Sequence, residues 1–131
     1  MDLNQVTPEP GNLNAELVDL YMGLGSVVYA LAKVDGRIQS AELQMVKELL
    51  AGVPHGDLAL YVFSLRETCD ESVEKAYTFA MRRFVNNRKA LTEPTKKQFV
   101  NILLRVADAH DDTSRKEQEL IKRFRRDLRR L

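Results

Sequence analysis

The sequence predicts an all-α protein: a single domain of about six helices, built from two pseudo-repeated helix-turn-helix units. Apolar residues recur at intervals of three and four along most of the chain, which is the period of a helix with one buried face. No segment alternates convincingly between apolar and polar residues, as a half-buried strand would. At 131 residues the chain is long enough to bury a core without disulfides or a structural metal.

The N-terminal part of the chain is expected to change character near Asn14. Residues 1–11 hold two prolines and a glycine and lack apolar periodicity, so we expect a flexible lead-in before a domain over residues 12–131. The first helix then contains Gly23 and Gly25, each of which weakens a helix by about 1 kcal/mol relative to alanine. A close contact with another helix is therefore expected at these glycines.

The later helices are predicted from their capping residues. Ser114-x-x-Glu117 has the spacing of a capping box, and Phe124 and Leu128 of the same helix are expected to face the core. In chain order, the other helices are expected to start with Ser40 as N-cap, to follow Asp57, to run from about Asp70 to Lys89, and to open at Thr92.

Charge is distributed unevenly along the chain, although the net charge is only +1. Residues 1–70 carry 4 basic and 10 acidic side chains, whereas residues 71–131 carry 16 and 9. An acidic face and a basic face are therefore expected. The single cysteine, Cys69, excludes an internal disulfide, and neither a secretory signal nor an apolar run of membrane-spanning length is evident, so a cytoplasmic location is expected.

The stretch from Val34 to Leu43 has an aspartate, a glycine and a later glutamate, as the second half of a calcium-binding loop does. With Gly36 at the sixth position and Glu42 at the twelfth, however, the first and third ligand positions fall on Leu31 and Lys33. The stretch offers roughly four oxygens where calcium takes about six to eight. A self-contained calcium loop is therefore not expected.

A second segment resembles this turn. At an offset of 75 residues, two apolar quartets coincide and Glu42 aligns with Glu117. If two such units pack together, their acidic turns form one shared site from Asp35, Glu42, Glu117 and an aspartate of the second turn, Asp108, Asp111 or Asp112. The alternative is that the glutamates only stabilise helix starts, where a carboxylate gains about 0.3 to 1 kcal/mol, and that Asp35-Gly36 is only a turn.

The residues Leu31-Ala-Lys-Val-Asp-Gly-Arg-Ile-Gln-Ser-Ala-Glu42 resemble the alanine-x-x-aspartate-glycine pattern, closed by a glutamate, of the TerB-like tellurite-resistance family, which also occurs in DjlA-type co-chaperones. The resemblance implies an all-helical, bacterial, stress-associated domain without enzymatic activity. It also implies acids that bind a divalent metal ion and cooperation with a membrane-bound TerC-type partner, which would place the protein at the inner membrane.

The acidic positions of the family pattern correspond directly to Asp35, Glu42 and Glu117 in this sequence. In the second turn His110 aligns with Asp35, and Asp111 takes that role only with a one-residue gap.

No nucleophile-base pair, phosphate-binding glycine loop or zinc spacing is evident, so a non-enzyme is expected. The leading hypothesis is a metal-binding adaptor that uses the acidic turns. The rival is a metal-independent interaction module whose basic C-terminal surface binds an acidic protein or an anionic membrane, with nucleic acid less favoured. Its candidate contacts are Arg125, Arg126, Arg129 and Arg130.

Overall fold

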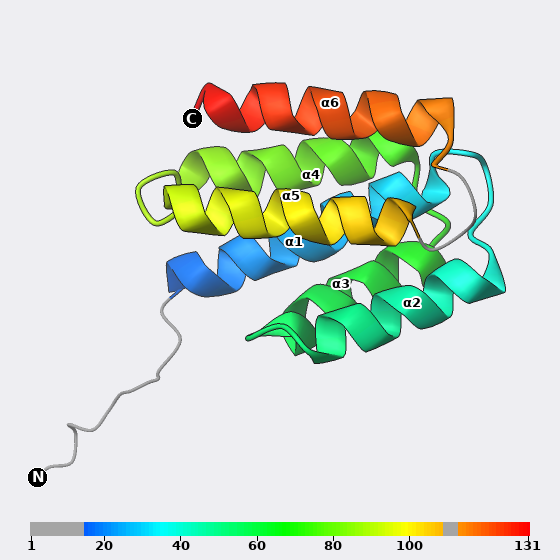
Figure 1. The fold of residues 1–131 in the computed structure, drawn as a ribbon. Helices are drawn as coiled ribbons and strands as arrows, with labels where there is room; N and C mark the ends of the chain where they lie inside the picture. Colours follow the sequence, from blue (N-terminus) through cyan, green and yellow to red (C-terminus); the bar gives the residue numbers. More distant parts are fainter. Residues whose placement is uncertain (1–14, 109–112) are drawn as a thin grey trace, which may run out of the picture.

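The computed structural model describes residues 15–108 and 113–131, and within these ranges it contains six α-helices and no strand. This confirms the all-α fold class, while the lead-in expected over residues 1–11 lies outside the described residues. Figure 1 shows the helices in their chain order. They are α1 Ala15–Lys33, α2 Ser40–Ala51, α3 Gly56–Thr68, α4 Val73–Asn86, α5 Glu93–Ala107 and α6 Arg115–Arg129.

Helix α1 is the centre of the bundle and contacts α3, α4, α5 and α6. Between Leu20 and Ala32 every residue except Met22 is buried, as expected for a helix that is apolar on all sides. Among the described residues it is also the one helix long and apolar enough to cross a membrane by length and composition, which the sequence reading had not expected. In the fold, 67% of that apolar window is buried.

The glycines of α1 lie where neighbouring helices approach closely. A Cβ atom built on Gly25 would lie 2.0 Å from the backbone oxygen of Ala59 in α3, and one on Gly23 would lie 2.9 Å from the ring of Phe84 in α4. Since real Cβ atoms do not come this close to backbone oxygen, only glycine fits at Gly25. The predicted close contact is confirmed.

Three of the expected helix starts are displaced in the structure. Helix α3 begins at Gly56, one residue before Asp57, because the chain turns at the N-cap His55, whose φ of 62° is left-handed. The N-cap of α2 is Gln39 instead of Ser40, because Glu42 then occupies the third helical position and its side chain reaches back to the cap. Helix α4 begins at Val73 after the N-cap Ser72, a few residues later than Asp70, whose φ of 50° is left-handed. The predicted N-cap Thr92 is confirmed.

The helix ends that flank the acidic turns lie at one end of the molecule. The end of α1, the start of α2, the end of α5 and the start of α6 all lie at the right side of Figure 1. Helix α6 packs on the bundle through Phe124 and Leu128, which are 0% and 2% exposed, so the predicted inward face is confirmed. This arrangement places Glu42 and Glu117 at neighbouring helix starts.

Candidate functional site

Glu42 is a buried carboxylate at the first turn of α2. Its side chain is only 2% exposed, and Oε1 accepts a hydrogen bond of 3.2 Å from the backbone N–H of Gln39. The N–H groups of a first turn lack partners within the helix, and the helix dipole favours a negative charge there. The Glu42 carboxylate therefore stabilises the start of the helix.

Glu117 occupies the same position in α6 and forms a complete capping box. Its Oε1 accepts a hydrogen bond of 2.9 Å from the N–H of Ser114, and its own N–H donates to Ser114 Oγ at 3.0 Å. The predicted capping box is thus confirmed. Glu117 is only 1% exposed, and its second oxygen, Oε2, is buried without a hydrogen-bond partner. Buried polar atoms are rarely left in this state in folded proteins.

The two acidic turns lie within electrostatic reach of each other. The pKa of Glu117 is raised above its ordinary value, first because burial removes water from the carboxylate and further because Glu42 and Asp35 contribute negative charge. The hydrogen bonds from Ser114 act in the opposite direction. Because Glu42 and Glu117 are 75 residues apart in sequence, only the fold brings these charges together.

Asp35 stands at the edge of this group. It is exposed and lies in a turn in which Gly36, with a φ of 102°, donates its N–H to the carbonyl oxygen of Lys33 at 2.7 Å. That φ suits glycine, which is why the aspartate-glycine pair forms the turn. The Asp35 side chain is therefore presented to solvent beside two buried glutamates.

The second acidic turn is described only in part. Asp108 is exposed and accepts a hydrogen bond of 3.0 Å from the hydroxyl of Thr113, while Asp111 and Asp112 lie outside the described residues, as does His110. Over residues 15–108 and 113–131, no three His, Cys, Asp or Glu side chains are already arranged to hold a metal ion. The described acids thus form a cluster of negative charge without a closed coordination shell.

The donor chemistry of this cluster nevertheless fits a divalent cation. Carboxylate oxygens are ligands for hard cations such as Ca²⁺, Mg²⁺ and Mn²⁺. The buried Glu117 Oε2 lacks a partner and lies in the field of two further acids. A cation there would satisfy this oxygen and offset the repulsion.

The predicted basic surface on α6 is formed in part. Arg125, Arg126, Arg129 and Arg130 are all exposed. Arg125 and Arg129 join Lys96 and Lys97 of α5 around a hollow of about 380 Å³, which Val100 and Leu128 also line. Arg126 instead lies 3.6 Å from Asp127. The structure therefore brings two of the four arginines together with the lysines of α5.

A second basic hollow, between the end of α3 and α4, was missed by sequence reasoning. It contains Arg66 and Arg83, which both stack on Phe79. The spacing of the lining residues of α4 could have shown that they share one face of that helix, but Arg66 belongs to α3. Only the folded structure shows that these side chains meet.

The family model for tellurite resistance protein TerB matches residues 22–129. The chain belongs to the TerB family. The resemblance seen in residues 31–42 is thus confirmed. The matched range covers most of the bundle and includes the three acids Asp35, Glu42 and Glu117. Comparisons with curated proteins and with solved structures gave no match. Family membership supports a role related to tellurite resistance.

Proposed function

We propose that this TerB-family protein is a non-enzymatic, stress-associated adaptor that binds a divalent metal ion at the starts of α2 and α6. The observation that carries the proposal is the buried oxygen of Glu117. It has no hydrogen-bond partner, and the charges of Glu42 and Asp35 lie close enough to raise the pKa of its carboxyl group. Burial of like charges is unfavourable unless a positive charge compensates.

The capping hydrogen bonds prepare the glutamates for this role. In both residues Oε1 accepts the N–H of the N-cap, which fixes the carboxylate at the first turn. Asp35 can approach from the solvent side, because its turn leaves the side chain exposed. When bound, the ion supplies positive charge that joins the two turns. The family suggests that this state is read by a membrane-bound TerC-type partner at the cytoplasmic side of the inner membrane.

Thermal unfolding with added metal tests the proposal. Protein freed of metal by a chelator is titrated with Ca²⁺, Mg²⁺, Mn²⁺ or Zn²⁺, and the melting temperature is recorded. A ligand that binds only the folded state stabilises it by about 2.7 kcal/mol at a free concentration near 100 times its Kd. The wild type should respond to at least one hard cation, whereas Glu42→Gln with Glu117→Gln should not.

Two exposed glutamates on the same helices provide the matched control. Glu48→Gln with Glu119→Gln removes the same amount of charge from α2 and α6 but leaves the buried carboxylates in place. This variant should respond to metal like the wild type. No wild-type response to any of the four ions at millimolar concentration, or an equal loss in both double variants, would refute metal binding at this site.

The hollow between α5 and α6 favours a second candidate function, the docking of an acidic protein or an anionic membrane surface. Lys96 pairs with Glu93 at 3.0 Å, while Lys97, Arg125 and Arg129 bring positive charge to a lining that also contains Val100 and Leu128. This combination suits an anionic surface. Binding to vesicles with anionic lipid, lost in Arg125→Ala with Arg129→Ala and insensitive to chelator, would favour this candidate over metal binding.

A further inference from the structure

The hollow between the end of α3 and α4 has a volume of about 630 Å³ and follows one face of α4. Its α4 residues recur at intervals of three and four, so they share one side of the helix. The charged and aromatic residues that line it are Arg66, Glu74, Lys75, Phe79, Arg82 and Arg83. The volume is within the usual range of binding sites, about 300 to 1,000 Å³.

Two arginines are held in this hollow by one aromatic ring. The guanidinium carbons of Arg66 and Arg83 lie 4.3 Å and 4.5 Å from the centre of the Phe79 ring. Stacking of this kind fixes the plane of a guanidinium group, so less freedom is lost when it binds an anion. The Nε atoms of both arginines are buried without a hydrogen-bond partner, so the stack is formed at the expense of two hydrogen bonds.

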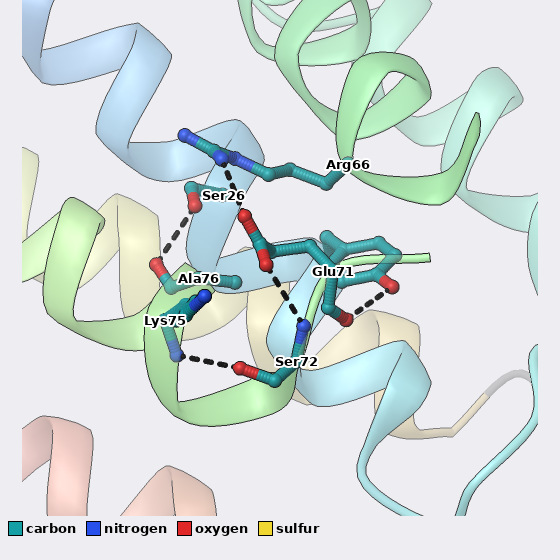
Figure 2. Close-up of polar contacts among 7 residues, drawn as sticks. Ser26, Arg66, Glu71, Ser72, Lys75 and Ala76 are labelled. Carbon is teal, nitrogen blue, oxygen red and sulfur yellow. Dashed lines mark hydrogen bonds and ion pairs between the residues drawn. The ribbon is translucent and has the colours of Figure 1, made fainter. Parts of the chain in front are cut away.

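The acids near the hollow are already engaged. Figure 2 shows Glu71 between Arg66, at 3.1 Å, and the backbone N–H of Ser72, at 3.2 Å. Glu74 receives two hydrogen bonds from Arg123, at 2.8 Å and 3.1 Å.

The remaining cations of the hollow are uncompensated. Within the described part of the chain, Lys75, Arg82 and Arg83 have no carboxylate partner. The hollow therefore holds surplus positive charge on a protein whose net charge is only +1.

We propose that this hollow docks an acidic segment of a partner protein, with Arg82, Arg83 and Lys75 taking its carboxylates. Lys75 and Arg82 are seven residues apart on α4, about 10 Å along the axis, a distance that about three residues of an extended peptide cover. The middle of α4 offers no unpaired backbone N–H groups, which phosphate sites commonly use. Side-chain cations alone favour carboxylates spread along a peptide.

Fluorescence anisotropy of a labelled oligoglutamate peptide tests the proposal on the full chain. Arg82→Ala with Arg83→Ala should weaken binding by about tenfold or more. Lys47→Ala with Arg105→Ala removes equal charge at exposed positions outside both hollows and should change binding by less than about twofold. Arg82→Ala alone, at an exposed position, should already weaken binding measurably and keeps the test valid if the double variant unfolds.

Three results would overturn the proposal. One is no binding of oligoglutamate by the wild type at low salt. Another is equal weakening by the two double variants, which would mean unspecific attraction of an anion. The last is tighter binding of a single-stranded oligonucleotide that displaces the peptide and depends on Arg82 and Arg83, which would assign the hollow to nucleic acid.

Discussion

Burial raises the pKa of Glu117, and the charge of Glu42 raises it further, although the two residues begin different helices and lie 75 positions apart in the sequence. Both carboxylates are almost fully buried, at 2% and 1% exposure. The start of α2 and the start of α6 are therefore linked electrostatically. The negative charge at the first turn of α2 thus acts on the carboxyl group at the first turn of α6.

The raised pKa of Glu117 predicts a pH dependence of stability in the absence of metal. The folded state holds the proton more tightly than the unfolded chain, so this group's contribution is present below the ordinary value of 4.5 and is lost as pH rises through the raised pKa. Glu117→Gln should be more stable than wild type at neutral pH, and the difference should shrink toward pH 4.5. Denaturant unfolding across this range measures it.

Glu119→Gln is the control for this experiment, because the residue is exposed on the same helix and pairs only with Arg115 at 3.5 Å. Its pH profile should follow that of the wild type. Identical profiles for the wild type and Glu117→Gln would contradict the prediction.

The contact between α1 and α3 predicts a large effect of a small substitution. Gly25→Ala places a methyl group 2.0 Å from the Ala59 oxygen, so the helices must separate, and the free energy of unfolding should fall by about 3 kcal/mol. Gly52→Ala is the matched control, since its Cβ would meet the nearest atom, Leu49 O, at 3.6 Å. Chemical denaturation would contradict the prediction if both variants had similar stability.

The helix caps provide a test of one corrected helix start. Ser114→Ala should lower the free energy of unfolding by about 1 kcal/mol, because the N–H of Glu117 loses its acceptor. Ser40→Ala should change it by less than about 0.5 kcal/mol, because Ser40 is exposed and follows the N-cap Gln39. Equal effects in urea unfolding would mean that Ser40 is the N-cap after all.

A buried hydroxyl group links α4 to α6. Tyr77 is 2% exposed and donates a hydrogen bond of 2.6 Å to the carboxylate of Asp127. Tyr77→Phe should therefore lower the free energy of unfolding by about 2 kcal/mol, as expected for a hydrogen bond to a charged group. Tyr61→Phe, at a position 63% exposed, should leave stability unchanged. If Tyr77→Phe left the melting temperature unchanged, the prediction would be wrong, and water would have to replace the lost hydrogen bond.

Local patterns in the sequence predicted those features that depend on nearby residues. Ser114 and Glu117 are three positions apart, so their capping box follows from one helical turn. Two glycines inside an apolar helix predicted the close packing of α1. The predicted N-cap of α2 was wrong by one residue, because serine is the commoner N-cap residue. In the structure Glu42 is the third residue of the helix and bonds back to Gln39, which makes Gln39 the N-cap.

Features that depend on distant residues were not all predictable. The offset between Glu42 and Glu117 suggested that two turns meet, and the structure brings their charges together, but the pseudo-repeat itself stays a prediction. No pattern indicated that Arg66 of α3 would stack with Arg83 on Phe79. Such a contact depends on how two helices cross, which short-range periodicity does not encode.

Helix α6 carries the capping carboxylate of Glu117 in its first turn and the exposed arginines toward its other end. Its 15 residues form a rod of about 22 Å. A proton or cation taken up at the first turn therefore acts on the same stiff element that presents Arg125 and Arg129. If cation binding at the first turn changes the affinity for an anion at the basic end, reciprocity requires the anion to change the affinity for the cation by the same factor.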